Sequence, residues 1–323
     1  MKRRKRHTLL KCMILAVLAG AVIRYTGVFP DSFTPPGQIQ SQVHVEQKNA
    51  KSKADSGTIE KHIKESQETG TENETPEAKV SHGYAYETIS TEQQTVYDEI
   101  YRIIMTHDSK VPVSTCDEKV LEKAYRSVIA DHGGIFWVSG YNYTQYTMGK
   151  KTVSIDFSPS YTVDRDERDS YQSRIDSVVD SILKNVDSSW GDYEKAKYVF
   201  EYLAGNIEYE MGTEQNQNII SVFLNKKTVC QGYANATQYL LSLLGIRAVV
   251  VTGTAEGDTH AWNLVQLDGA YYFIDTTWGN SSYNNGESGF GSFINYNYFG
   301  VTTAEISKTH QADGTLLLPD CTA

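Results

Sequence analysis

The sequence predicts an α+β fold in which helices pack on an antiparallel sheet. A helical run that begins at Cys230 is followed by a β-branched strand and then by two alternating apolar strands around Asp268-Gly269. Upstream, helix and strand patterns share the stretch 86–162. With 323 residues, of which 40% are apolar and 22% charged, the chain can form one or two domains with real cores.

The helical run carries a cysteine at its start. Gly245 stands where a left-handed residue would end the helix, and the residues with helical spacing before it are Ala234, Leu240, Leu241 and Leu244. Cys230 therefore lies in the first turn, where unpaired N–H groups and the helix dipole favour a thiolate over a thiol. A lone cysteine is more often a small buried apolar residue, so position alone does not make it a nucleophile.

The dipeptide Asp268-Gly269 is typical of a two-residue hairpin turn, and it sets a register for the flanking strands. The opposed pairs are then Leu267 with Ala270, Trp262 with Asp275, and His260 with Thr277. Side chains alternate with period two, so one face of the hairpin holds His260, Trp262, Phe273, Asp275 and Thr277. His260 and Asp275 become diagonal neighbours, about 7–8 Å apart at Cα, and their side chains can meet.

These three residues are the components of a Cys-His-Asp triad. A carboxylate at Asp275 can hold the His260 ring in one tautomer while the other ring nitrogen faces the Cys230 sulfur. Taken singly, His260 could be a core histidine and Asp275 a satisfied aspartate at a strand end. Their shared face and the upstream cysteine at a helix start favour catalysis.

Three motifs in this order resemble the transglutaminase-like superfamily, whose core has a papain-like arrangement of catalytic groups. They are Val229-Cys-Gln-Gly-Tyr-Ala234, His260-Ala-Trp-Asn263 and Tyr272-Phe-Ile-Asp-Thr-Thr-Trp278. The resemblance covers about residues 190–300 and is nearest to secreted or membrane-anchored bacterial members. It implies that Cys230 is the nucleophile, His260 the general base and then acid, and Asp275 the residue that orients it.

Other site residues are less well specified. The backbone N–H of Cys230 should supply one oxyanion donor. Gln217, Asn218, Trp190 and Gln231 are candidates for the second donor, with Asn218 preferred, because the chain lacks the glutamine that papain-like proteases carry shortly before the nucleophile. Trp262 is a further candidate for substrate contact. The sequence has no recognisable metal or cofactor motif, so we expect neither, and the calcium dependence of some cross-linking members does not carry over.

The N-terminus predicts export. Residues 1–29 combine a basic start with an apolar run from Cys12 to Ile23, which suits a signal peptide or an uncleaved membrane anchor. Either alternative places the remaining chain outside the cytoplasm, secreted or tethered. The net charge is −10 although six basic residues lie in the first eleven positions, so the acidic remainder argues against nucleic acid as a partner.

Composition divides the rest into three parts. Residues 30–85 are polar and without period, and we expect a disordered linker. Residues 86–162 should form a small α+β module with two helices and three strands, and 163–323 the catalytic domain. Four tyrosines of the module are candidates for a ligand platform or are simply strand residues: Tyr141, Tyr143, Tyr146 and Tyr161. Residues 279–297 should form a long loop, and 297–300 and 316–318 should add strands.

The expected chemistry is acyl transfer at amide bonds of peptide or protein substrates, with cell-envelope peptides among the candidates. The reaction most expected is peptidase-like hydrolysis, and the alternatives are glutamine–amine cross-linking or a non-catalytic surface scaffold. The number of cysteines leaves open whether one disulfide bond forms. Cys116 and Cys321 could form a disulfide in an oxidising compartment, which would leave Cys230 free.

Overall fold

The structure is a computed structural model that describes residues 44–49, 57–61, 64, 81–280 and 294–322. The predicted export segment 1–29, most of the predicted linker and the centre of the loop at 279–297 lie outside these residues. Within the described ranges, no helix combines the length and apolar character needed to cross a membrane.

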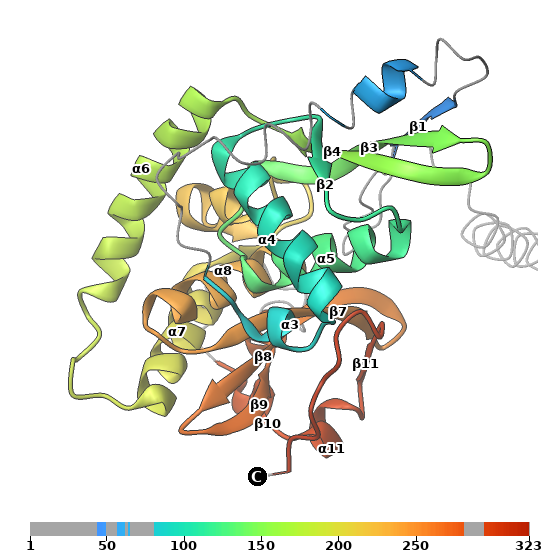
Figure 1. Ribbon diagram of the computed structural model, residues 1–323. Coiled ribbons are helices and arrows are strands. Elements are labelled where there is room, and N and C mark those ends of the chain that lie inside the picture. Colours follow the sequence, from blue (N-terminus) through green and yellow to red (C-terminus); the bar gives the residue numbers. More distant parts are fainter. Residues whose placement is uncertain (1–43, 50–56, 62–63, 65–80, 281–293, 323) are drawn as a thin grey trace, which may run out of the picture. The chain divides into compact units, whose positions relative to one another are not determined.

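The N-terminal part of the described chain forms helices beside a four-stranded sheet (Figure 1). Its helices are α3 (Tyr84–Glu87), α4 (Thr91–Thr106) and α5 (Glu118–Asp131). Its strands are β1 (His44–Asn49), β2 (Val111–Val113), β3 (Val138–Met148) and β4 (Lys151–Tyr161), in the order β1-β3-β4-β2. Helix α4 begins with the expected capping box, in which the Ser90 and Gln93 side chains each accept from the other's backbone N–H.

This part differs from the sequence-based prediction in two places, and it decides between the two alternatives for Tyr141 and Tyr143. Strand β1 lies inside the segment expected to be disordered and pairs in parallel with β3. The sequence predicts three strands in this module, whereas the structure has two longer strands here, β3 and β4, which form an antiparallel hairpin. Tyr141 and Tyr143 are buried against other aromatic rings, so they belong to the core and do not form an exposed platform.

Two long helices lead from this sheet to the cysteine helix. They are α6 (Arg165–Leu183) and α7 (Asp192–Asn206). A small two-stranded pair and one π-helical turn follow: β5 (Glu208–Tyr209), η1 (Ser221–Asn225) and β6 (Lys227–Thr228). Helix α8 (Cys230–Leu243) then begins directly after β6, and Gly245 adopts the expected left-handed conformation with φ 78°.

The C-terminal part is a five-stranded antiparallel sheet in the order β10-β9-β8-β7-β11 (Figure 1). Its strands are β7 (Ala248–Ala255), β8 (Asp258–Leu267), β9 (Ala270–Ile274), β10 (Phe299–Val301) and β11 (His310–Ala312). Short helical turns connect them: α9 (Thr276–Gly279), η2 (Tyr296–Tyr298) and α11 (Thr303–Ile306). Helices packed on an antiparallel sheet confirm the predicted α+β class. The last strand is His310–Ala312, so the strand predicted at 316–318 was wrong.

One hydrophobic cluster runs through both the expected module and the expected catalytic domain. It includes Ile100 of α4, Leu121 of α5, Leu203 of α7 and Leu240 of α8. Helix α5 also packs directly against β7. The residues before and after position 162 are therefore held together by shared apolar burial.

Candidate active site

Cys230 is the first residue of α8, as the sequence predicts. Val229 precedes it as the N-cap and has an extended backbone, and no side chain caps this end of the helix. The backbone N–H groups of the first turn consequently remain available to stabilise negative charge. The Cys230 side chain is buried, with 2% of the residue exposed.

Two side-chain hydrogen bonds attach α8 to the elements that carry the other two residues. The Asn263 side-chain amide on β8 donates to the Ala234 carbonyl of α8 at 2.9 Å. The hydroxyls of Thr237 on α8 and Thr276 on α9 lie 2.8 Å apart. Both bonds are buried, so the helix start is fixed relative to strand β8 and turn α9.

The hairpin of β8 and β9 follows the register counted from the sequence. Leu267 pairs with Ala270, and the register continues unchanged to Asn263 opposite Ile274. It ends there, because Asp275 begins helical turn α9 and accepts from the Trp278 backbone N–H through Oδ1 at 3.1 Å. The predicted opposition of Trp262 with Asp275 and of His260 with Thr277 is therefore wrong. His260 pairs instead with Gly253 of β7.

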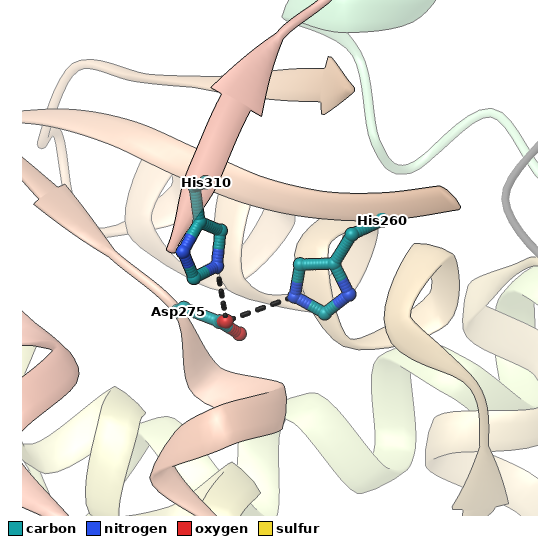
Figure 2. Close-up of side chains that lie close together, drawn as sticks. All are labelled: His260, Asp275 and His310. Atoms are coloured by element: carbon teal, nitrogen blue, oxygen red, sulfur yellow. Dashed lines mark hydrogen bonds and ion pairs between the residues drawn. The ribbon is translucent and has the colours of Figure 1, made fainter. Parts of the chain in front are cut away.

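His260 and Asp275 nevertheless meet. The distance between Nε2 of His260 and Oδ2 of Asp275 is 2.8 Å (Figure 2), and 3% of His260 and none of Asp275 is exposed. Cys230 also lies close enough to His260 to contribute, after Asp275, to the rise of its pKa. Because Asp275 occupies Nε2, Nδ1 is the ring nitrogen that remains for the sulfur. The structure thus brings the three predicted residues together in the order Cys–His–Asp.

Pairing with the Asp275 carboxylate, more than burial, determines the protonation state of His260. Burial alone would lower the pKa of His260, but the Asp275 charge and hydrogen bond, together with Cys230, raise it from 6.5 to about 10. Burial would raise the pKa of Asp275, but His260 and His310 outweigh it and hold that pKa below its usual value. An imidazolium between a carboxylate and a sulfur is the state expected near neutral pH.

A third residue of the cluster, His310, was not predicted from the sequence. Its Nε2 lies 3.0 Å from Oδ2 of Asp275, so two imidazoles share one carboxylate oxygen (Figure 2). His260, Asp275 and His310 offer ligand atoms within 4.8 Å of one another and could in principle hold a metal ion. Their N···O distances of 2.8 and 3.0 Å are those of direct hydrogen bonds.

The remaining predicted contacts have local partners. The Asn218 side chain donates to Gln215 Oε1 at 2.9 Å and accepts from the Ile220 N–H at 2.9 Å, so it stabilises its own turn. Gln231 is buried and donates to the Asn235 side chain at 3.0 Å. Trp262 belongs to the hydrophobic cluster under the sheet, and its indole ring stacks 6.1 Å from the His260 ring.

Residues 177–276 match the family model of the transglutaminase-like superfamily, a range that contains Cys230, His260 and Asp275. This part of the chain is therefore similar to the core of that superfamily. Curated relatives of similar sequence are the kyphoscoliosis peptidases of Homo sapiens and Mus musculus, each 25% identical over 159 residues. The aligned region covers 44% of this chain and 24% of each relative, so the chain spans about a quarter of their length.

Solved structures that part of this chain resembles include a TGase and the periplasmic domain of TgpA from Pseudomonas aeruginosa. The TGase is 15% identical with a TM-score of 0.31, over 43% of this chain and 51% of its own. The TgpA domain is 15% identical with a TM-score of 0.29, over 45% of this chain and 60% of its own.

The cysteines among the described residues are unpaired. Cys116 is exposed, whereas Cys230 and Cys321 are buried, and none of the three forms a disulfide. The pairing of Cys116 with Cys321 that the sequence left open is therefore not present. The Cys230 sulfur is free to act as a nucleophile.

Gly232 of the Cys-Gln-Gly motif sets the distance between α8 and the preceding strand. A Cβ at this position would lie 1.8 Å from the Thr228 hydroxyl oxygen, which is fixed by bonds to Asn216 and Ser221. We expect Gly232→Ala to lower the free energy of unfolding by about 1–3 kcal/mol in a denaturant titration. The matched control is Gly205→Ala in α7, where the nearest atom lies 3.9 Å away and the change should be neutral or stabilising. Equal effects of the two substitutions would contradict this packing role.

The charge of His260 should also appear in the pH dependence of stability. Its pKa rises from 6.5 to about 10 on folding, so its contribution is complete below pH 6.5 and is lost as the pH rises through 10. We expect wild type to exceed His260→Gln in free energy of unfolding by more at pH 6.5 than at pH 10, with a change of at most about 5 kcal/mol. Denaturant titrations at both pH values measure it. A constant difference would show that His260 is not charged in the folded protein.

Proposed function

We propose that this protein is a thiol enzyme that acts on amide bonds of peptide or protein substrates, most readily as a peptidase-like hydrolase. The observation that carries the proposal is the buried His260 ring, which hydrogen-bonds Asp275 through one nitrogen and is left with the other for Cys230. A merely structural histidine would not need both partners. The basic and apolar N-terminal sequence supports an extracytoplasmic location, secreted or membrane-tethered.

The reaction would proceed through an acyl-enzyme. The Cys230 thiolate forms an S–C bond with the substrate carbonyl, and His260 transfers its proton to the leaving amine as the C–N bond breaks. A water molecule then attacks the thioester, gives one proton to His260 and releases the acid with the thiolate restored. If a primary amine replaces water, the product is a new amide. Backbone N–H groups in the first turn of α8 would stabilise the oxyanion.

Incubation with a peptide library, with and without a primary amine, tests the proposal. Mass spectrometry distinguishes the outcomes, because cleavage, deamidation and amine incorporation change substrate mass in different ways. Hydrolysis of a peptide bond by wild type and not by His260→Ala would support the proposed peptidase. Amine incorporation would identify a cross-linking transferase instead. No product in any reaction, together with no reaction of Cys230 with thiol probes between about pH 6 and 8, would indicate a non-catalytic scaffold.

A further inference from the structure

His310 reaches the catalytic cluster from the last strand of the sheet. Strand β11 pairs with β7, on the side of β7 away from β8, and places His310 opposite Ala255. Its side chain is 1% exposed and points at Asp275, as does the side chain of His260 (Figure 2). A polar side chain buried this deeply is normally held by hydrogen bonds, and His310 has one on each ring nitrogen.

The bond from His310 completes the set of donors around Asp275. Oδ1 accepts from the Trp278 N–H at 3.1 Å, while Oδ2 accepts from His260 at 2.8 Å and from His310 at 3.0 Å. Without His310, Oδ2 would be held only by the hydrogen bond from His260, and the charge of that ring must change during the reaction. Because the carboxylate is fully buried, a second donor also stabilises its negative charge where water cannot.

Thr309 fixes the tautomer of His310. The Thr309 hydroxyl lies 2.8 Å from Nδ1, and Nε2 faces a carboxylate that can only accept. A neutral ring satisfies both contacts when Nε2 carries the proton and Nδ1 accepts from the hydroxyl. His310 can then donate to Asp275 without taking a proton from the pair formed with His260.

Gly253 allows β11 to approach closely enough for this contact. A Cβ at position 253 would lie 2.1 Å from the backbone oxygen of Gln311 and 2.8 Å from Cα of Ala312. Gly253 also pairs with His260 on its other side. The close approach of the backbones therefore sets the position of His310 relative to the hairpin.

We propose that His310 is a positioning residue of the active site: it holds the Asp275 carboxylate in the orientation that aligns His260 with Cys230. The inference rests on the proposed function, because it concerns the reactivity of the same cysteine. It predicts that loss of the hydrogen bond between His310 and Asp275 slows the reaction of Cys230, although the hydrogen bonds of His310 are to Thr309 and Asp275. Misplacement of a catalytic group by a fraction of an ångström to 1 Å can reduce rates by about 10²-fold.

The test is the second-order rate of Cys230 alkylation by iodoacetamide near neutral pH, followed by peptide mapping so that other cysteines are scored separately. We expect His310→Phe, which fills the space without a donor, to slow the rate by about 10- to 100-fold. His310→Gln, whose amide can donate to Oδ2, should recover most of it. Thr309→Val should slow the reaction and Thr309→Ser should not, because only serine keeps the hydroxyl.

Proton NMR gives a readout that a purely structural role would not move. Wild type should show two low-field imidazole N–H signals from His260 and His310, and His310→Phe should lose one and shift the other. Gly253→Ala keeps His310 but displaces β11, and it should give the slow rate of His310→Phe. If His310→Phe does not fold, Thr309→Val and Gly253→Ala still decide the question.

The outcomes separate this inference from the proposed function. If Cys230 of wild type reacts no faster than Cys321, the enzymatic proposal itself fails. If wild type is reactive and folded His310→Phe reacts equally fast or faster, only the role of His310 is overturned. A wild-type rate that rises on addition of EDTA and falls with added zinc would assign the cluster of His260, Asp275 and His310 to metal binding, which would also overturn it.

Discussion

Cys230→Ser should abolish covalent labelling at position 230 by thiol-directed probes and lower turnover of any peptide substrate by roughly 10³-fold or more. The sulfur lies at the uncapped start of α8, close to a histidine whose pKa is raised to about 10. A serine hydroxyl in its place would not be ionised to a comparable extent. Peptide mapping after exposure to a peptide-like electrophile would show an adduct at position 230 for wild type and none at that position for the variant.

Two other cysteines provide the controls. Cys321→Ser changes a buried cysteine in another cluster, and Cys116→Ser changes an exposed one, so both variants should keep the adduct and the turnover. If Cys321→Ser lost turnover as completely as Cys230→Ser, the loss would reflect stability and not nucleophilic attack. Adduct formation at Cys116 alone would leave the assignment of Cys230 without support.

Asp275→Asn should cost about 10⁴-fold in turnover while the fold is retained. The substitution keeps the shape of the side chain but removes the negative charge that compensates burial of the His260 ring. Without it, burial lowers the pKa of His260, and the imidazolium that must protonate the leaving amine is lost near neutral pH. Steady-state kinetics should therefore show a fall in kcat, with the loss deepening as the pH rises.

A matched aspartate lies on the same hairpin. Asp268 is exposed at the turn and has φ 50°, a conformation that asparagine also tolerates, so Asp268→Asn should leave kcat unchanged. Retention of full activity by Asp275→Asn would contradict the triad. A parallel loss in Asp268→Asn would point to a folding defect of the hairpin.

The sequence was sufficient for the triad because local rules determine each of its parts. Asp268 and Gly269 both have positive φ, as a type I′ turn requires, and this turn fixes the register that brings β8 and β9 together. The register counted from this turn is wrong beyond Ile274, because the Asp275 side chain caps a helical turn that the strand pattern did not reveal. The His260–Asp275 contact survives because the turn starts immediately at the strand end.

His310 escaped prediction for a physical reason. Its strand has only three residues, pairs with a distant segment, and shows no apolar alternation that would reveal it. The histidines look scattered in the sequence, and only the tertiary fold places two of them on one carboxylate oxygen. In hindsight Gly253 was the available signal, because a glycine within a strand often marks a close backbone approach.

The continuous hydrophobic cluster that joins α4 and α5 to α7 and α8 determines which fragments of this protein can be studied separately. A fragment that begins at residue 163 would remove the part of this cluster that α4 and α5 supply, including Ile100 and Leu121. Such a truncation should aggregate or lose cooperative melting. If this fragment failed to cleave a substrate, the cause would be the loss of apolar packing and not the absence of a catalytic residue. Reactivity should therefore be measured on protein that retains the chain from residue 81 onward.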